Sequence, residues 1–449
     1  MKGSYEALAK KLVQRALKQG AQQAEAFLSA GRESSCRVRD GEIEDLTEAT
    51  SKGVGLRVFV KGRLGFAFTS DFDPSSINAF VDQALRLAEA AAPNPLNGLP
   101  TRNELKTRVK LEGLFDAEVA ALAPDWKVKA ALEMERAGKD YDPRVSTFES
   151  VGAGENVVEV VVASSEGLLD GYAGTYVYLQ ASPVASDRGQ LQTSYWVDVK
   201  RYLRELDSPE SVGREAARRA VRMLGAKKIP SARVPVVFDP QMAAGFVRSV
   251  AGAASGDAVY KKSSFLAALK GERIAPSSVT LVDDGLLPGG IATAPFDGEG
   301  VPTRSTPIID RGVLTNFLYD AFTARKAKAR STGNASRGYD SLPGIGSHNL
   351  YLKAGDRVPE AIIAGVKSGL YVTAMLGRGM NPVSGEYSRG ANGLWIENGE
   401  LAYPVQEVTV AGNALEMLQG IDAIGNDLEF RGSTAAPTLR FAEMTVSGA

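Results

Sequence analysis

The stretch GVGLRVFVKGRLGFAFTS, residues 53–70, decides the class of fold. Runs of β-branched and aromatic residues stand on both sides of Lys61-Gly62, and glycine is favoured in the tight turns that join antiparallel strands. Upstream, Asp40-Gly41 separates two more runs of the same type. The stretch and its neighbours therefore predict an antiparallel sheet built from hairpins.

Helical patterns flank these predicted hairpins. Between residues 5 and 19, apolar side chains recur every three or four positions and Gly20 follows, which predicts an amphipathic helix with a glycine stop. Asp73-Pro74 opens a second helical pattern that Pro93 closes. The loop APNPLNGLP, residues 92–100, then leads away from this unit.

A similar order of patterns recurs further along the chain. A helical stretch at 116–138 precedes strand-like runs, and Ser208-Pro209 opens another helix. We therefore predict an α+β protein whose N-terminal domain, residues 1–230, is a mixed α/β domain with an antiparallel sheet and long helices. An internal duplication, 1–92 and 116–226, and chance similarity of two α+β segments both remain open.

The remainder, residues 231–449, has a different pattern. VPVVFDP reads as a strand and AAGFVRSVAGAASG as a helix of small residues, after which Gly- and Pro-rich loops separate short β-type runs. The alternation of loops and short β-type runs predicts a β-rich, barrel-like C-terminal domain.

Composition excludes several classes of function. Lys plus Arg number 52 and Asp plus Glu 53, so the net charge is −1 and no basic excess favours nucleic acid or an anionic membrane. The one cysteine, Cys36, fits a reducing compartment and a structural role. Charged residues interrupt the N-terminal segment, and no apolar run approaches the ~20 residues that span a bilayer. We expect a cytoplasmic protein without a membrane segment.

The histidine content restricts the possible catalytic and metal sites most strongly, because the chain has one histidine, His348. A multi-histidine zinc site cannot be built within this chain, and a Ser-His-Asp triad could use that residue alone. An ordinary loop histidine is the favoured interpretation. A metal site of His348 with Asp297 and Glu299 stays an alternative that no ligand spacing supports.

Two other charged groups have simple structural interpretations. Asp283-Asp284, Asp297 and Glu299 lie beside glycines, so turn formation explains them as well as metal binding does. The basic run TARKAKARSTGN, which holds Arg325, reads as the solvated face of a helix that ends at a glycine loop.

Longer blocks carry a specific resemblance. These blocks are FDGEGVPTRSTPIIDRGVLTNFLYDAFTARKAKARSTGNASRG at 296–338, HNLYL at 348–352, GLYVTAMLGRGMNPVSGEYSRGANGLWIENGELAYPVQEVTVAGNALEML at 369–418, and IGNDLEF at 424–430. Together with residues 53–70 they resemble the TldD/PmbA family of metallopeptidase-like proteins, also known as modulators of DNA gyrase. The resemblance covers essentially the whole chain.

The resemblance also shows where the zinc ligands of one branch of the family would lie. In the TldD branch of that family an H-E-x-x-x-H helix binds zinc, its glutamate activates water, and a cysteine near the C-terminus completes the metal site. The corresponding segments here, GFVRSVAGAASGD at 245–257 and FRGSTAAPTLRF at 430–441, contain no histidine, glutamate or cysteine. The chain therefore resembles the PmbA branch, also called TldE.

The resemblance implies a non-catalytic subunit of a cytoplasmic zinc metallopeptidase that processes peptides. No cofactor is expected in this chain, and zinc is expected in a TldD-type partner that bears H-E-x-x-x-H. The alternatives are a stand-alone homodimer that binds peptide or another ligand, and an indirect regulator of DNA gyrase without direct DNA contact.

No catalytic or metal-binding residue is predicted in the chain. Substrate contacts are expected instead on loops that combine polar side chains with glycines, where main-chain pairing could hold an extended peptide. A purely structural role for these residues is the alternative. They are Asn334, Arg337, Arg378, Asn381, Glu386, Ser388 and Asn392.

Overall fold

The computed structural model describes residues 2–73, 75–377 and 379–448. The N-terminal region begins with α1 (Lys2–Lys18), β1 (Gln23–Arg39), β2 (Glu42–Val60), β3 (Arg63–Thr69) and α2 (Ile77–Ala90). It continues with α3 (Ala117–Ala120), α4 (Pro124–Tyr141), β4 (Val145–Ser164), β5 (Leu169–Asp187), β6 (Gln190–Thr193), β7 (Trp196–Lys200), the 3-10 turn η1 (Leu203–Glu205) and α5 (Pro209–Val221).

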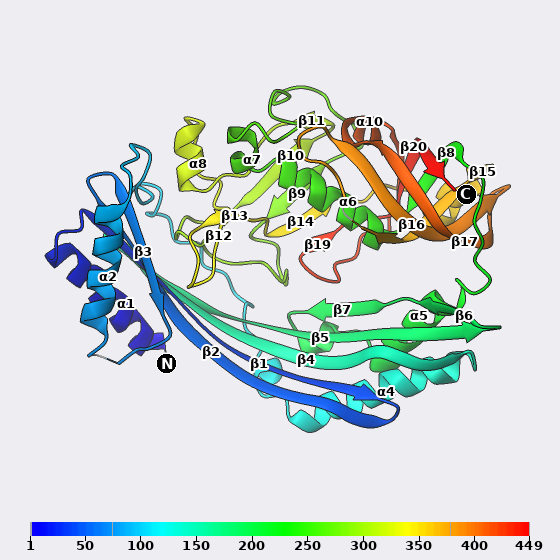
Figure 1. Cartoon of the computed structure of the whole chain (residues 1–449), viewed down its shortest axis with the longest axis horizontal. Helices are drawn as coiled ribbons and strands as arrows, with labels where there is room; N and C mark the ends of the chain where they lie inside the picture. The colour runs from blue at the N-terminus through cyan, green and yellow to red at the C-terminus, as the bar shows by residue number, and fades with distance from the viewer. Residues whose placement is uncertain (1, 74, 378, 449) are drawn as a thin grey trace.

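The N-terminal strands form one long antiparallel sheet. Its order is β3-β2-β1-β4-β5-β6, with β7 also paired to β5. The sheet curves beneath the C-terminal region like an open half-barrel (Figure 1). Two helices flank the strands on each side of the central β1–β4 pair: β1, β2 and β3 lie between α1 and α2, and β4, β5, β6 and β7 lie between α4 and α5.

The predicted hairpin turns are confirmed. Arg39 pairs with Glu42 and Val60 with Arg63, so each turn has two central residues. All four central residues have positive φ: Asp40 at 52°, Gly41 at 82°, Lys61 at 49° and Gly62 at 74°. Two positive φ values give a turn whose twist matches that of the flanking strands.

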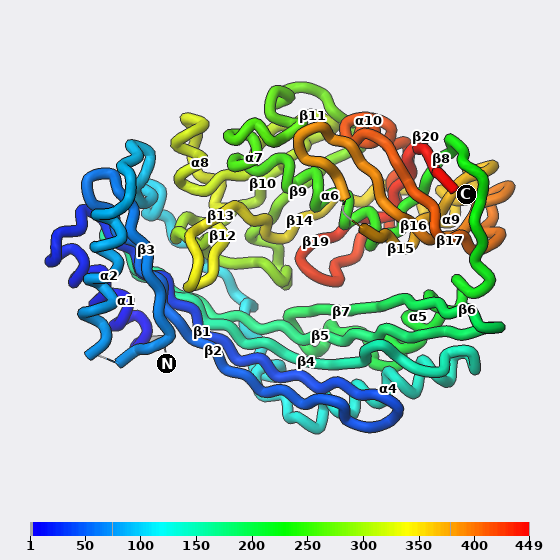
Figure 2. Tube along the Cα trace, in the orientation of Figure 1, coloured from blue at the N-terminus to red at the C-terminus, as the bar shows by residue number. Residues whose placement is uncertain are grey.

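The helices of the N-terminal region cover the convex side of the sheet. α1 and α2 pack at one end, and α4 and α5 at the other (Figure 2). Their apolar faces make two separate cores: Leu12, Phe80 and Leu56 lie in the first, and Met134, Phe148 and Cys36 in the second. Cys36 is fully buried, in agreement with its predicted structural role.

Gly65 allows α2 to approach β3 closely. A Cβ at this position would lie 2.0 Å from the Ala84 carbonyl oxygen and 2.6 Å from the Ala88 backbone nitrogen. Backbone atoms cannot move aside as a flexible side chain can, so we expect Gly65→Ala to lower the free energy of unfolding by about 1–3 kcal/mol. Urea unfolding measures the change.

Gly252 supplies the matched control for Gly65. It lies inside α6, and a Cβ there would meet no atom within 4 Å. Alanine at this position should therefore raise stability by about 0.5–1 kcal/mol, because it restricts the unfolded chain and favours the helix. A stable Gly65→Ala protein would show that α2 does not pack as described.

The C-terminal region contains the remaining strands and helices. They are β8 (Ala232–Phe238), α6 (Pro240–Ala253), α7 (Gly256–Tyr260), β9 (Leu281–Asp284), β10 (Ser305–Asp310), β11 (Val313–Leu314), α8 (Ala321–Lys326), β12 (Ala335–Ser336), β13 (Gly344–Ile345), β14 (Asn349–Leu352), α9 (Pro359–Ala364), β15 (Ser368–Leu376), β16 (Glu386–Glu397), β17 (Glu400–Asn413), α10 (Ala414–Gln419), β18 (Ile421–Ile424), β19 (Thr434–Ala435) and β20 (Leu439–Ser447).

Five of these strands close on themselves. The pairing runs β17-β16-β15-β8-β20, and β20 pairs back with β17. A closed ring leaves no free edge among its members, and α6 packs Phe246 against Phe441 at a ring-centroid distance of 5.4 Å. The prediction of an α+β fold with a barrel-like, β-rich C-terminal region is confirmed.

The two regions are joined by apolar contacts and by a basic side chain. Phe27, Val160 and Val162 of the sheet pack with Phe296 and Val301. Arg325 of α8 donates to the carbonyl oxygens of residues 96, 98 and 99 at 2.7–3.2 Å. The prediction of a solvated basic face is therefore wrong for Arg325, because the long loop from the N-terminal region folds over its guanidinium. No helix of the described residues is long and apolar enough to cross a membrane.

Candidate functional site

A cavity of about 350 Å³ lies where the sheet meets the C-terminal region. Its lining comes from the start of β7, from α6, from β15 and β16, and from the segment between β18 and β20. The cavity therefore combines residues from both regions of the chain, which is a common location for ligand sites.

One face of α6 forms a wall of this cavity. Gln241, Gly245 and Arg248 line it, and their spacing of four and three residues places them on one side of a helix. Asp239 is the N-cap of this helix, and its carboxylate accepts a hydrogen bond from the Met242 backbone N–H at 3.0 Å. This N-cap fixes where the helix starts.

Asp239 is also tied to the N-terminal region. It is fully buried and forms an ion pair of 2.9 Å with Arg219 of α5. Burial raises the pKa of the Asp239 carboxyl above its ordinary value, even though Arg219 acts in the opposite direction. The pair therefore holds α5 against the first turn of α6 at an electrostatic cost.

The two segments that the resemblance equates with the metal-binding parts of the TldD branch meet at this cavity. Arg248 Nε donates to Thr434 Oγ1 at 3.4 Å across it. From these segments the cavity is lined by Gly245, Arg248, Arg431, Thr434, Ala435 and Ala436. Zinc takes Cys, His or carboxylate ligands, so these residues do not fit a zinc ion.

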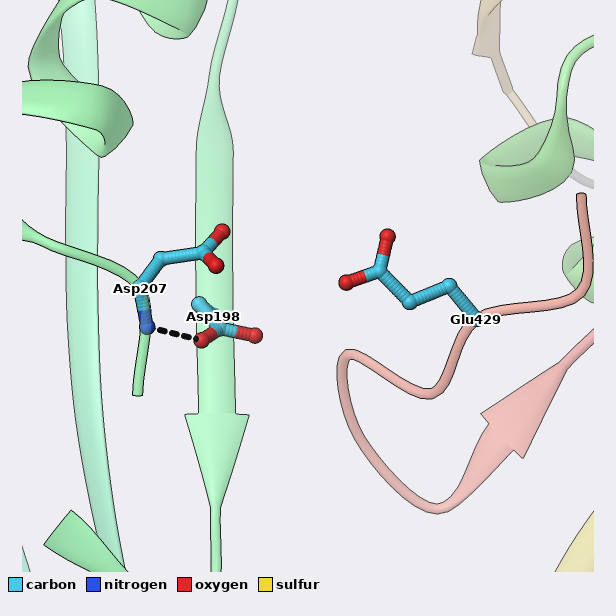
Figure 3. A group of neighbouring side chains, drawn as sticks. All are labelled: Asp198, Asp207 and Glu429. Atoms are coloured by element: carbon cyan, nitrogen blue, oxygen red, sulfur yellow. Dashed lines mark hydrogen bonds between the residues drawn. The ribbon is translucent and has the colours of Figure 1, made fainter. Parts of the chain in front are cut away.

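An acidic group lies beside the cavity. Asp198 on β7, Asp207 after η1 and Glu429 on the opposite loop offer ligand atoms within 4.8 Å of one another (Figure 3). Within the described residues it is the only group of three or more potential metal ligands of this kind.

Two cations already occupy the acidic group. Arg431 Nη1 lies 2.7 Å from Asp207 Oδ2 and 3.4 Å from Asp198 Oδ1. Lys200 Nζ lies 3.1 Å from Asp198 Oδ1, and Arg431 Nη2 lies 2.8 Å from Glu429 Oε1. These pairs lock β7 to the loop before β19, and a metal ion would have to displace them.

The Trp196 ring contacts two guanidinium groups. The Arg219 Cζ atom lies 4.1 Å from the ring centroid, and the Arg431 Cζ atom lies 4.4 Å from it. Cation–π contacts of this kind favour a charge held over an aromatic face. The tryptophan thus positions the two arginines that orient α6 and the acidic group.

The structure divides the residues that were predicted to contact substrate. Asn334 is buried, and its Nδ2 donates to Asp283 Oδ2 at 2.6 Å and to the Gly346 carbonyl oxygen at 2.9 Å. The Arg337 side chain is fully buried and pairs with Glu25 Oε1 at 2.5 Å. These two residues hold loops and the interface between the regions together.

Three of the other predicted residues, Asn381, Glu386 and Ser388, lie in the β15–β16 connection or at the start of β16, and Asn392 lies further along β16. Asn381 Oδ1 accepts from the Val383 N–H at 2.9 Å, and Glu386 and Ser388 are exposed at the start of β16. Asn392 Oδ1 accepts from the Glu407 N–H at 3.1 Å beside a bulge. Arg378 lies outside the described residues.

His348, Asp297 and Glu299 are each engaged in hydrogen bonds or ion pairs within the chain, and the Glu299 backbone N–H donates to Asp297 Oδ1 at 2.9 Å. His348 Nε2 hydrogen-bonds the Gly333 carbonyl oxygen at 2.7 Å, whereas Asp297 accepts from the Ala335 and Val301 N–H groups at 2.9 Å. Glu299 pairs with Arg57 at 2.9 Å. They form no group of three adjacent metal ligands in the described part of the chain.

The residues that line the cavity could not be recognised from the sequence. Trp196, Gln241, Arg248, Arg389 and Arg431 come from segments far apart in the chain. The one signal that could have pointed to them is the resemblance, which equates 245–257 and 430–441 with the two parts of a metal site.

The molecule thus combines a curved antiparallel sheet with a closed barrel, and the cavity at α6 lies between them. Residues 24–88 match the PmbA/TldA metallopeptidase domain 1, residues 118–224 its central domain, and residues 231–448 its C-terminal domain. The chain belongs to the PmbA/TldD family of metallopeptidases.

Individual relatives agree with this assignment. The chain is 32% identical to metalloprotease PmbA of Escherichia coli O157:H7, over 95% of this chain and 92% of that protein. A Bacteroides thetaiotaomicron protein named for modulation of DNA gyrase superposes with a TM-score of 0.91 at 28% identity, covering 99% of this chain and 98% of that one. TldE from Thermococcus kodakarensis shares the fold, with a TM-score of 0.89 at 24% identity and coverage of 98% and 100%.

Proposed function

We propose that the chain is the non-catalytic, PmbA/TldE-type subunit of a zinc metallopeptidase that processes peptides in the cytoplasm. Its partner is a TldD-type subunit that carries H-E-x-x-x-H and the zinc ion. This chain supplies structure and peptide contacts, and it holds no cofactor of its own.

The observation that carries the proposal is the composition of the cavity at α6. The face of α6 that lines it presents Gln241, Gly245 and Arg248, and the facing segment presents Arg431 and Thr434. A catalytic zinc site needs three protein ligands and an open position for water. The carboxylates nearby, Asp198, Asp207 and Glu429, already have cationic partners.

The names of the relatives support the peptidase context. They describe metalloproteases and a TldE protein of the same fold. The single cysteine supports a reducing location. The net charge of −1 argues against direct binding to DNA, so an effect on gyrase would be indirect, through the processing of a peptide.

The exposed start of β16 is the proposed peptide contact among the predicted loop residues. Glu386 is exposed there and makes no ion pair in the described residues. We expect Glu386→Ala to reduce peptide turnover by the two-subunit complex, because a polar contact to the substrate is lost. The subunits should stay associated. Glu400→Ala, at the exposed start of β17, is the matched control. Unchanged turnover for Glu386→Ala would remove Glu386 from the site.

Tagged purification from the native host tests the partnership. Mass spectrometry and band intensities should identify one equimolar partner bearing H-E-x-x-x-H. Recovery of this chain alone, as a homodimer, would contradict the proposal and favour a stand-alone ligand-binding protein. Salt-sensitive DNA binding by the pure chain would contradict the indirect role in gyrase regulation.

A further inference from the structure

We propose that the cavity at α6 binds the carboxylate group of an extended peptide, through Arg248 and Arg389. The choice of a peptide as ligand rests on the proposed function, whereas the anion site rests on the cavity itself. The site lies where the segments 245–257 and 430–441 meet at the cavity.

Arg248 and Arg389 are the two cations of the cavity without an acidic partner. Both side chains line it, Arg248 from α6 and Arg389 from β16. Neither forms an ion pair with a carboxylate in residues 2–73, 75–377 and 379–448. The third cation in the lining, Arg431, is committed to Asp207, Asp198 and Glu429.

The bonds of Arg389 within the chain are long. Its Nη2 approaches the carbonyl oxygens of Met375 at 3.5 Å and of Gly377 at 3.4 Å. Its Nε atom is buried and has no hydrogen-bond partner among the described residues. A buried donor without an acceptor is costly, so an anion that reaches this guanidinium would stabilise the site.

The acidic residues of the lining are engaged elsewhere. Asp427 accepts from the Thr438 backbone N–H at 2.9 Å and from its hydroxyl at 2.7 Å. Glu429 accepts from Arg431 at 2.8 Å. Neither carboxylate neutralises Arg248 or Arg389, but both oppose an incoming anion. A singly charged group is therefore favoured over a doubly charged phosphate.

The rest of the lining suits a peptide rather than an inorganic anion. Met242, Met375 and Ala244 add apolar groups to the same lining. Gln241 and Tyr195 add an amide and a phenol that can bond a main chain. A volume of about 350 Å³ falls in the range of sites that hold small ligands, and here it accommodates the end of a peptide.

Calorimetric titration of the full-length chain tests the site without any partner subunit. The probes are an alanine-rich hexapeptide with a free C-terminal carboxylate, the same peptide as its C-terminal amide, and an amide version with one internal glutamate. We expect the free acid to bind at least tenfold more tightly than the plain amide. Binding of the glutamate peptide at the strength of the free acid would also support a carboxylate site and would identify a side chain as the source.

Variants assign the binding to the cavity. Arg248→Gln and Arg389→Gln should each lower the affinity for the free-acid peptide by fivefold or more. The affinity for the plain amide peptide should stay unchanged. Arg233→Gln is the matched control, because Arg233 is exposed at the far end of β8 and pairs with Glu443. Thermal unfolding of each variant shows that the fold is retained.

Three results would overturn the inference. They are equal affinity for acid and amide, loss of affinity in Arg233→Gln alone, and inorganic phosphate that competes more strongly than the free acid. None of them bears on the partner subunit, and failure to find an H-E-x-x-x-H partner would leave these titrations unaffected. The two proposals can therefore fail separately.

Discussion

Arg57→Met is expected to lower the free energy of unfolding by about 3–5 kcal/mol, as measured by urea unfolding. Arg57 lies on β2 and bridges two buried carboxylates. Its Nη2 is 2.8 Å from Glu25 Oε2 and its Nη1 is 2.9 Å from Glu299 Oε1. The side chains of the three residues are at most 6% exposed.

The size of this effect follows from burial of unpaired charge. Burial alone would lower the pKa of Arg57, yet Glu25 and Glu299 raise it above its ordinary value. Without the guanidinium, Arg337 still balances Glu25, but Glu299 becomes a buried carboxylate without a cation. Solvation in the unfolded chain then favours unfolding.

A second substitution tests this explanation. Adding Glu299→Gln to Arg57→Met removes the unbalanced charge, and the amide oxygen can still accept from the Ala321 N–H that Glu299 bonds at 2.8 Å. The double variant should regain most of the lost stability. A loss below about 1 kcal/mol for Arg57→Met would show that water or another charge already compensates Glu299.

Arg219→Met is expected to lower the free energy of unfolding by about 3–5 kcal/mol at pH 7 and by less at acidic pH. It removes the ion pair of 2.9 Å with the fully buried Asp239 and the contact of 4.1 Å with the Trp196 ring. Burial already raises the pKa of Asp239 in the presence of Arg219. Loss of the arginine raises that pKa further.

The sign of the pH dependence follows from proton binding. A raised pKa means that folded Asp239 holds a proton at pH values where the unfolded carboxyl, with a pKa near 3.8, has released it. The folded state then binds more protons than the unfolded state, so stability falls as pH rises through this interval. The deficit of Arg219→Met should therefore be larger at pH 7 than at pH 4.

Asp239→Asn in the Arg219→Met background supplies the control. Asparagine can cap α6 as aspartate does but does not titrate, so the added pH dependence should disappear. Urea unfolding at several pH values between 4 and 7 measures both variants. A deficit for Arg219→Met that does not change with pH would mean that Asp239 is not the responsible group.

The sequence was informative where structure depends on local chemistry. Lys61-Gly62 and Asp40-Gly41 form the predicted two-residue turns, and small residues form α6 where a helix was predicted. These features depend on neighbours along the chain, on turn conformation and on helical periodicity.

Features that depend on contacts between residues far apart in the chain could not be predicted from the sequence. Arg325 looked solvated, because nothing in the sequence shows that residues 96–99 fold over it. Arg337 looked like a loop contact, although Glu25, more than three hundred positions earlier, buries it in an ion pair. The cavity at α6 has the same origin, since its lining spans residues 195–436.

Zinc content and peptide hydrolysis should be measured on the purified chain and on its complex with an H-E-x-x-x-H subunit, because they show which subunit holds the catalytic site. We expect no stoichiometric zinc and no turnover for this chain alone, and about one zinc per heterodimer with turnover for the complex. Tightly bound, stoichiometric zinc with peptide turnover in the isolated chain would contradict it.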